Sequence, residues 1–450
     1  RKGNRMTDEV SQLVERLNDA HHDEQRIVFE DAVDQLEGTE LALLLESLPV
    51  AERLERWEQV PDEERINVLV TMRSESRQAI FDSIDEEKLH ALLNNVHAED
   101  LVQLADTLPE SVVDEALQNM AEMQREHYQQ SVQYETDQIG RYVDHGLYIL
   151  PRTARVRDAL RGLKKSSFEC ADCLYLIKRN GDFAGTVLIQ TLFSAPPEKS
   201  LQALSIDEPM TVPAEMSRST ASDKVEHSGL MALPVVDANN KLSGRITLRQ
   251  ALEITRENYE SQLMATAGLN EDEDLFAPVL RSSKRRATWL GINLLTAFFA
   301  SWAIGLFEAT LQQVVALAVL MPIVASMGGI AGSQTLTLII RGLALGQIAK
   351  GNIPPLLIKE VSVGALNGVL WAIVIGVIAS FWFASINIGL VIAAAIVLNI
   401  IAAAFSGVVI PIILDRLTID PALSGSVILT TVTDVVGFVA FLGLGTLFLL

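Results

Sequence analysis

The last part of the chain consists mostly of five long apolar segments. They cover roughly residues 287–307, 314–345, 356–384, 388–414 and 422–450. Each reaches the ~20 residues that an α-helix needs to cross a bilayer. Because lipid offers no hydrogen-bond partners to the backbone, such segments cross it as helices. The sequence therefore predicts a transmembrane domain of five spans at residues 287–450.

Charge divides the chain into two parts. Residues 281–450 hold eight of the 36 Lys and Arg and five of the 57 Asp and Glu. Residues 1–280 therefore carry a net charge of −24, against +3 for the apolar part. The acidic excess argues against nucleic acid as a partner, because nucleic-acid binders need basic patches. It favours cations as partners, although an acidic region that is merely well solvated has the same charge.

Basic residues gather on one side of the predicted spans. With the N-terminus inside, the outside loops carry no Lys or Arg, whereas the inside boundary carries Arg281, Lys284, Arg285, Arg286, Arg341, Lys350, Lys359 and Arg416. This is the distribution that the positive-inside rule describes. No cleavable signal is recognisable near the start. We expect a multi-pass protein of the cell inner membrane, with the N-terminus cytoplasmic and Leu450 outside.

Residues 1–130 contain a short helical repeat. Units such as PDEERINVLVTM, RSESRQAIFDSI, DEEKLHALLNNV and PESVVDEALQNM begin with Pro, Ser or Asp followed by acids, and carry aliphatic residues at helical spacing. Pro in the first turn and acids near the N-terminus are helix start signals, because the first N–H groups are unpaired and the dipole is positive there. The narrow apolar faces must pack on neighbouring units. We predict an α-helical superhelical N-domain without a catalytic site.

Residues 131–255 change to strand-type periodicity. LYLIKRNGDFAGTVLIQTLF has two strand-like runs around Asn180–Gly181, and ALPVVDANNKLSGRITLRQALE repeats the scheme. This tandem resembles a pair of α+β CBS domains, which commonly bind nucleotides. That family often places an Asp after the second strand to hold a ribose, where this chain has Leu248, Arg249 and Gln250. Thr247 is kept as a possible nucleotide contact, but the missing Asp argues against ATP binding.

A connecting helix and linker are predicted at residues 256–286. Glu253, Glu257 and Glu260 have helical spacing and share one face. Like charges so arranged repel each other unless a cation or a basic partner neutralises them, so these residues are sensor candidates; a solvated face is the alternative. The acidic run at residues 271–274 is expected to be a flexible linker.

The two cysteines, Cys170 and Cys173, form a single Cys-x-x-Cys motif. One such motif supplies at most half of a tetrahedral zinc site. The apolar residues that follow it look like the start of a strand. We therefore expect a structural role, and no disulfide framework.

The stretch LMPIVASMGGIAGSQTLTLIIR, residues 320–341, lies inside the second span but is rich in glycine and polar residues. It contains Pro322, Gly328, Gly329, Ser333 and Thr337. Polar side chains and non-helical backbone at membrane depth are tolerated only where protein or water covers them. We predict a glycine-broken helix that forms the wall of a pore, with freed carbonyls near Gly328 and Gly329.

Asp434 is the acid that the sequence places deep in a span. An ionised carboxylate there costs at least ~2.5–3.5 kcal/mol unless it is paired or hydrated. No basic residue lies deep enough to pair with it, so a transported cation is the simplest partner. Thr430 lies one turn away on the same face. The alternative is a protonated, hydrogen-bonded structural Asp.

The donor atoms near these positions are oxygens. Carboxylate, hydroxyl and carbonyl oxygens suit hard cations, Mg²⁺ above all, and no Cys or His follows residue 227 to hold soft metals. Because Mg²⁺ loses its waters reluctantly, one carboxylate with retained waters is a plausible site.

The order of domains resembles the MgtE family of magnesium transporters and channels over nearly the full length. The supporting motifs are P-x5-GGIAGSQTLTLIIRGLALG from Pro322, DPAL at Asp420–Leu423 and TDVVGF around Asp434. The resemblance implies a homodimer whose pore lies between the two subunits, with the Asp of the last helix binding hydrated Mg²⁺. It also implies cytosolic domains that close the pore when internal Mg²⁺ is high.

The chain departs from the family pattern at several positions. Ile330 and Ser333 stand where the family usually has Asn, and Ser426 replaces another Asn. The acidic pair expected at Arg249 and Gln250 is lost. These departures bear on ion selectivity, on one Mg²⁺-sensing site and on ATP binding.

The sequence thus predicts a non-enzymatic homodimeric channel or transporter that passes Mg²⁺ into the cytoplasm, gated by its N and CBS domains. No phosphate-binding GxxxxGK[ST] loop is present. The alternatives are transport of another divalent cation such as Mn²⁺ or Co²⁺, a weakly gated variant, and a membrane-anchored CBS regulator that transports nothing.

Overall fold

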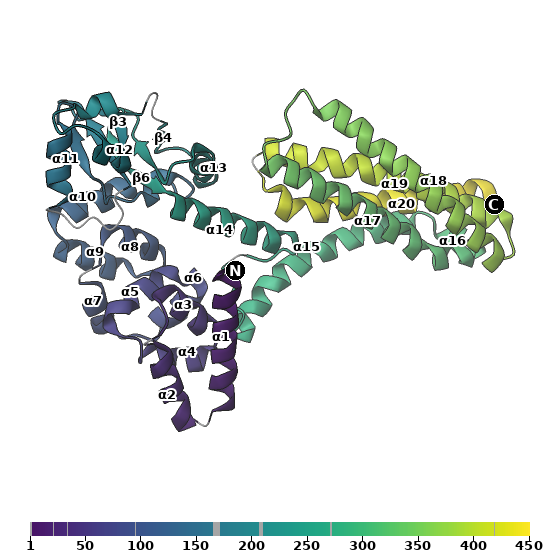
Figure 1. The fold of residues 1–450 in the computed structure, drawn as a ribbon. Helices are drawn as coiled ribbons and strands as arrows, with labels where there is room; N and C mark the ends of the chain where they lie inside the picture. The colour runs from purple at the N-terminus through teal and green to yellow at the C-terminus, as the bar shows by residue number, and fades with distance from the viewer. Residues whose placement is uncertain are drawn as a thin grey trace. The chain divides into compact units, whose positions relative to one another are not determined.

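The computed structural model describes residues 2–450 apart from 21, 34, 95, 165–171, 207–209, 271 and 418; of residues 2–9, 22, 23 and 266 only the backbone is described. The chain forms two compact units, which Figure 1 shows in ribbon form. The first comprises residues 1–260 and 271–279, and the second comprises residues 261–270 and 280–450. The expected order of helical N-domain, α+β tandem and five apolar helices is confirmed.

The N-domain is a stack of short helices. These are α1 (Lys2–Asp19), α2 (His22–Val33), α3 (Gly38–Glu46), α4 (Val50–Trp57), α5 (Asp62–Thr71), α6 (Ser74–Phe81), α7 (Glu86–Leu93), α8 (Ala98–Leu104), α9 (Glu110–Asn119) and α10 (Glu122–Ser131). Pro49, Pro61 and Pro109 cap α4, α5 and α9. The aliphatic residues of successive helices form one continuous core, as the repeat predicted.

Two three-stranded sheets follow, and they share one topology. In the first, β1 (Ile149–Pro151) pairs in parallel with β2 (Cys173–Ile177), which pairs antiparallel with β3 (Phe183–Leu188). In the second, β4 (Val212–Pro213), β5 (Ala232–Val236) and β6 (Leu242–Thr247) repeat this order, and both sheets have a register shift near the end of the middle strand. The helices of this tandem are α11 (Val156–Leu163), α12 (Ile189–Ser194), α13 (Arg218–Ser228) and α14 (Leu248–Thr266).

Cys173 begins the buried middle strand of the first sheet. Its side chain is buried, and burial raises the pKa of its thiol to about 11. A thiol with so high a pKa is a poor metal ligand and nucleophile. This fits the structural role expected from the sequence; Cys170 lies outside the described residues.

The acidic linker is held against the N-domain. Arg53 is 0% exposed and donates from Nη1 and Nη2 to the Asp274 carboxylate, at 2.5 and 3.0 Å. Its Nε also donates to the Leu45 carbonyl at 2.9 Å. The Asp274 amide donates to the Glu75 carboxylate at 2.8 Å. The expectation of a flexible linker was therefore wrong for Asp274, because a fully buried guanidinium needs a carboxylate partner.

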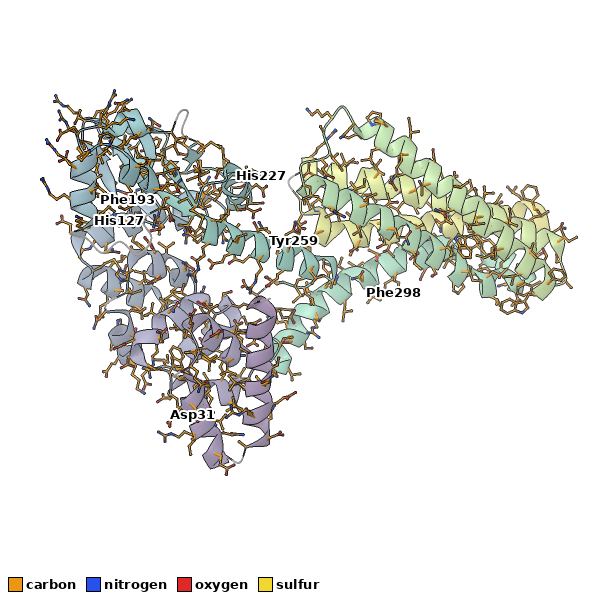
Figure 2. The ribbon with its side chains drawn as sticks, viewed as in Figure 1. Asp31, His127, Phe193, His227, Tyr259 and Phe298 are labelled. Atoms are coloured by element: carbon orange, nitrogen blue, oxygen red, sulfur yellow. The ribbon has the colours of Figure 1, made fainter. Side chains whose placement is uncertain are left out.

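Two histidines stack where the N-domain meets the strand tandem. His127 of α10, labelled in Figure 2, and His145, which precedes β1, have ring centroids 4.0 Å apart. The Glu99 carboxylate of α8 accepts a hydrogen bond from the His145 amide at 2.7 Å. The same carboxylate lies 3.4 Å from Nδ1 of the His145 ring. Burial and the neighbouring His145 lower the pKa of His127. The junction therefore favours the neutral form of His127.

Among its described residues the second unit has five helices long and apolar enough to span a membrane. They are α15 (Val279–Gly305), α17 (Val315–Ala344), α18 (Ile353–Trp382), α19 (Ile386–Arg416) and α20 (Pro421–Leu449), with the short α16 (Glu308–Gln313) between the first two. The central helix is α19, which packs against α17, α18 and α20. The large apolar side chains of α15, Phe298 among them, remain exposed in a single subunit (Figure 2).

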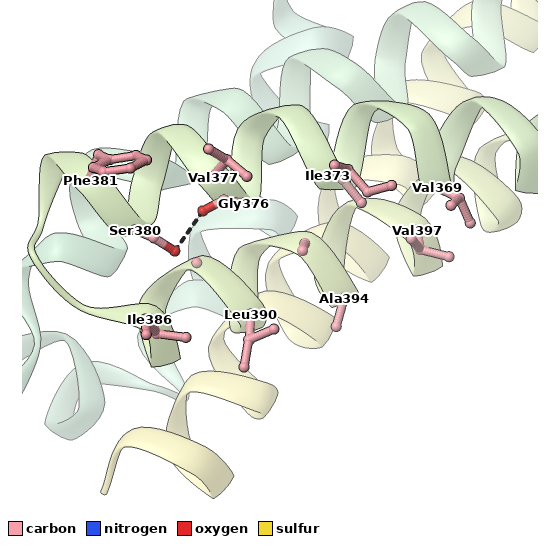
Figure 3. Close-up of a pocket in the computed structure, with 13 residues that line it drawn as sticks. Val369, Ile373, Gly376, Val377, Ser380, Phe381, Ile386, Leu390, Ala394 and Val397 are labelled. Carbon is pink, nitrogen blue, oxygen red and sulfur yellow. Dashed lines mark hydrogen bonds between the residues drawn. The ribbon is translucent and has the colours of Figure 1, made fainter.

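An apolar groove runs along the outside of α18 and α19, and Figure 3 shows its lining. Its volume is about 750 Å³, and its walls include Val369 and Ile373 of α18 and Leu390 of α19. The two helices approach closely here, since a Cβ on Gly389 would overlap the Gly376 carbonyl oxygen. Small residues at such crossings let membrane helices gain packing contacts.

Removing the carboxylate of Asp274 tests whether its pair with Arg53 holds the linker against the N-domain. Asp274→Ala leaves Arg53 buried without its charge partner, so we expect a loss of about 3–5 kcal/mol of unfolding free energy. Burial alone would raise the pKa of Asp274, but hydrogen bonds from Arg53 outweigh it and the pKa is lowered. The stabilisation is therefore present above pH ~3.9 and is lost as pH falls through the lower folded pKa.

Hydrogen exchange of α4 in the full chain measures this loss. The matched control is Glu30→Ala, which breaks the exposed Arg26–Glu30 pair and should cost only about 0.5 kcal/mol. Equal protection of α4 in the two variants would contradict this role of the buried pair.

Acidification should loosen the histidine junction. Because the folded-state pKa of His127 is lowered, its stabilising contribution is complete above pH ~6.5 and is lost as pH falls through the folded value. Exchange protection of α10, corrected for intrinsic rates, should fall between pH 7.5 and 5.5 in the natural chain and less in His127→Gln. His227→Gln, on the exposed end of α13, serves as the control. A pH response that survives His127→Gln unchanged would refute this assignment.

Candidate functional site

The pore-motif helix is continuous. α17 runs from Val315 to Ala344 as one helix of 30 residues, through Pro322 and through Gly328 and Gly329. The prediction of a glycine-broken helix with freed carbonyls was therefore wrong. The glycines are compatible with a regular helix because the packing around the helix, rather than its local propensity, decides its shape in a membrane.

One face of α17 carries a polar stripe that is uncovered in the structure. Ser326, Ile330, Ser333 and Thr337 are all exposed and follow one another at helical spacing. Ile330, which the family resemblance led us to expect as Asn, is 57% exposed. The structure thus places the predicted wall residues Ser333 and Thr337 on one surface, together with an apolar side chain.

The opposite face of α17 packs on its neighbours. Gly328 and Gly332 are buried, and a Cβ on Gly332 would lie 3.0 Å from Leu429 of α20. A Cβ on Gly328 would overlap the Asn399 side chain of α19. Gly329, by contrast, has no atom within 4 Å of where its Cβ would lie. The two adjacent glycines therefore differ: Gly328 makes room for another helix and Gly329 does not.

Asp434 is half-buried on α20, which packs against α17. No described residue donates a hydrogen bond to its carboxylate or pairs with it. Thr430, one turn earlier, is exposed, but its hydroxyl donates to the Ser426 carbonyl at 2.9 Å. Ser426, Thr430 and Asp434 follow at intervals of four residues and so lie along one side of α20. Within the described residues the Asp434 carboxylate is the charged group of this side, and no protein group offers it a counter-charge there.

Glu360 and Asn399 are among the buried polar residues of the spans that escaped the sequence reasoning. Glu360 of α18 is 5% exposed; its carboxylate accepts from the Thr335 hydroxyl at 3.3 Å and pairs with Lys359 at 2.5 Å. Asn399 lies in the middle of α19 and is fully buried. Glu360 was missed because it follows Lys359, which marked the span's boundary. It is another acid within the spans and is buried, whereas Asp434 is half-buried. Asn399 could have been found from the sequence, because it is an amide in the middle of an apolar run.

The sensor candidates on α14 all have arginine partners. Glu253 pairs with Arg249 at 3.2 Å, and Glu257 pairs with Arg218 of α13 at 2.7 Å. Glu260 pairs with Arg256 on its own helix, at 3.0 Å, and with Arg73 of the N-domain, at 3.2 Å. Basic partners, one of the two neutralising groups that the sequence allowed, therefore offset the repulsion between these glutamates. Their sensing role stays a prediction.

Thr247, the possible nucleotide contact, bonds to Gln250 in the structure. The Thr247 amide and hydroxyl both donate to the Gln250 side-chain oxygen, at 2.9 and 3.0 Å. The Gln250 side-chain nitrogen donates to the Tyr142 carbonyl at 3.2 Å. The amide and hydroxyl of Thr247 therefore both form hydrogen bonds at the start of α14. Position 250 is Gln rather than an acid that could hold a ribose.

Three family models match successive parts of the chain. Residues 36–137 match the MgtE intracellular N domain, residues 201–257 match the CBS domain, and residues 321–444 match the divalent cation transporter domain of MgtE. The chain belongs to the MgtE family. The MgtE divalent cation transporter domain spans α17 to α20 and includes both the polar stripe and Asp434.

Curated relatives are similar over much of their length. The magnesium transporter MgtE of Bacillus subtilis (strain 168) is 25% identical over 423 residues, which is 94% of each chain. The magnesium transporter MgtE of Thermus thermophilus is 25% identical over 321 residues, 70% of this chain and 71% of its own.

Solved structures are similar to parts of the chain. The cystathionine β-synthase pair domain of a putative Mg²⁺ transporter from Shewanella oneidensis MR-1 is 34% identical, with a TM-score of 0.33, and covers 37% of this chain and 98% of its own. The cytosolic domain of the Mg²⁺ channel MgtE in complex with ATP is 17% identical, with a TM-score of 0.46, and covers 54% and 99%.

Substituting the adjacent glycines separates packing from pore lining. Gly328→Ala forces a methyl group into the Asn399 side chain, so we expect about 1–3 kcal/mol of destabilisation from overpacking. Gly329→Ala adds its methyl to open space and should leave stability nearly unchanged. Thermal unfolding of the two full-length variants in the same detergent measures the difference. Equal melting temperatures would refute the packing role of Gly328.

Proposed function

We propose that the chain forms a homodimeric channel or transporter that passes Mg²⁺, as a hydrated divalent cation, into the cytoplasm. The observation that carries the proposal is Asp434, a carboxylate in the last span that has no partner within the described residues. It lies in the region that matches the divalent cation transporter family. A cation in transit is the simplest partner for such a charge in lipid.

The ion chemistry follows from the donor atoms. Asp434 supplies a carboxylate, and Ser333, Thr337 and Thr430 supply hydroxyl oxygens on exposed surfaces of α17 and α20. Thr430 presents its hydroxyl oxygen as an acceptor, since its proton is engaged with the Ser426 carbonyl. A site with only one or two carboxylates suits Mg²⁺, because this ion keeps most of its bound waters. Ile330 narrows the polar surface and is expected to change selectivity or conductance rather than abolish passage.

A second copy of the chain would cover the exposed polar stripe of α17 and would add a second Asp434 carboxylate to the pathway. The polar stripe of α17 faces outward from a single subunit, and polar side chains do not face lipid without cost. Pairing two subunits along this stripe covers it with protein and water. Two copies of Asp434 then face one pathway, which doubles the charge available to a divalent cation.

The cytosolic unit is proposed to gate this pathway. The distribution of Lys and Arg supports a cytoplasmic location for the N-domain and CBS tandem, where internal Mg²⁺ would act on them. Arg73 joins the N-domain to Glu260 on α14, and Arg218 joins α13 to Glu257. Both pairs are at least partly exposed and can exchange an arginine for Mg²⁺. The gating threshold therefore depends on how strongly these arginines compete with the cation.

Flux through the natural chain and through Asp434→Ala in proteoliposomes tests the proposal. Loss of the carboxylate should lower Mg²⁺ influx by about 100-fold, as expected from the ~2.5–3.5 kcal/mol that pairing a deep charge is worth. Glu308→Gln, which removes an exposed acid at the start of α16, is the matched control and should keep the flux.

Competition by Mn²⁺ and Co²⁺ in the same assay identifies the cargo. Stronger inhibition by Mn²⁺ or Co²⁺ than by unlabelled Mg²⁺ would reassign the ion. Equal, background-level flux in the natural chain and Asp434→Ala, at low and high internal Mg²⁺, would instead favour a membrane-anchored CBS regulator.

A further inference from the structure

Asn399 lies where three membrane helices meet. It is on α19, it is 0% exposed, and its Nδ2 donates to the Val324 carbonyl of α17 at 2.8 Å. Its Oδ1 is buried and accepts no hydrogen bond from the described residues. An amide in this position costs free energy that an apolar side chain of similar shape would not.

Glycines on two other helices make room for the amide. A Cβ on Gly328 of α17 would overlap Nδ2 of Asn399, and a Cβ on Gly437 of α20 would lie 2.6 Å from the same atom. Both approaches are closer than any that real Cβ atoms show. The amide therefore fills a space that is open on both sides only because both neighbours are glycine.

The two glycines belong to the helices that carry the ion pathway. Gly437 follows Asp434 by three residues, so both lie within one turn of α20. Gly328 lies between Ser326 and Ser333 of the polar stripe, on the opposite face of α17. A shift of either helix against Asn399 would move Asp434 relative to that stripe.

A hydrogen bond fixes such a position better than apolar contact does. Apolar side chains allow neighbouring helices to slide with little loss of contact, whereas a donor and acceptor meet in one register only. A single buried Asn sets register in this way in coiled coils, at a cost in stability. In a bilayer the competing partner, water, is absent.

We propose that Asn399 is a positioning residue of the ion pathway. By bonding the Val324 carbonyl and filling the space between Gly328 and Gly437, it fixes α20, and with it Asp434, against the polar stripe of α17. This inference rests on the proposed function, because positioning matters for transport only if Asp434 binds the cargo.

Asn399→Leu removes the hydrogen bond and keeps the approximate shape of the side chain. Two measurements are made on the full chain in liposomes: the Mg²⁺ concentration that gives half-maximal influx, and the ratio of Mn²⁺ to Mg²⁺ influx. We expect the half-maximal concentration to rise about three- to tenfold, the effect of one interhelical hydrogen bond in a membrane protein, and the ratio to change. A purely structural role would lower maximal influx alone, because fewer molecules would be folded.

A cross-link that does not depend on transport measures the helix positions. Gly332→Cys with Leu429→Cys places two thiols at a direct contact of α17 and α20, and their rate of disulfide formation is compared with and without Asn399→Leu. Cys170 and Cys173 are the same in both proteins. We expect the rate to fall with Asn399→Leu.

The outcomes separate the inference from the proposed function. A changed cross-linking rate in a chain that carries no Mg²⁺ would overturn the proposed function and still support positioning of the helices by Asn399. If the natural chain carries Mg²⁺, an unchanged cross-linking rate or an unchanged half-maximal concentration overturns the inference.

A second pair of variants covers failure of Asn399→Leu to fold. Gly328→Ala alone is compared with Gly328→Ala combined with Asn399→Ala, which empties the space that the new methyl group needs. Recovery of folded protein in the double variant supports the three-helix contact, and no recovery overturns it.

Discussion

The membrane unit is organised by the absence of hydrogen-bond partners in lipid. Every polar group at membrane depth must find a partner in protein, water or cargo. Thr335 and Lys359 provide partners for Glu360, and the Val324 carbonyl provides one for Asn399. Asp434 is different, because the described residues offer its carboxylate nothing. The α17 stripe is likewise uncovered in the structure. Asp434 and the α17 stripe both lie on helices that match the divalent cation transporter family.

The first unit, residues 1–260 and 271–279, has the opposite problem, which is an excess of negative charge. Arginine side chains pair with several of its acids. Arg53 is buried against Asp274, Arg73 reaches Glu260 and Arg218 reaches Glu257. These pairs join parts of the unit that lie far apart in the sequence, so they affect how its domains are held together as well as its charge. The buried pair is a fixed structural element, whereas the exposed pairs are weak and remain open to competition from cations.

Much of the fold could be predicted from local sequence patterns. The five spans, the repeated short helices and the two strand-turn-strand units each follow from periodicity within a few dozen residues, and the structure has all of them. Asp434 could also be singled out, because a carboxylate in an apolar run is visible without knowing what surrounds it. The glycine-rich stretch misled, since Gly328 and Gly329 look like helix breakers until the packing around α17 is known.

The sequence by itself determined which segments enter the membrane, the charge of each part and the acid that lacks a local partner, because these are properties of composition and spacing along the chain. The tertiary structure alone decided that α17 is unbroken, that Gly328 and Gly437 enclose Asn399, and that Arg53 holds the linker through Asp274. Each of these depends on residues separated by tens to hundreds of positions. Only folding brings such residues to within the few ångströms over which packing and hydrogen bonds act.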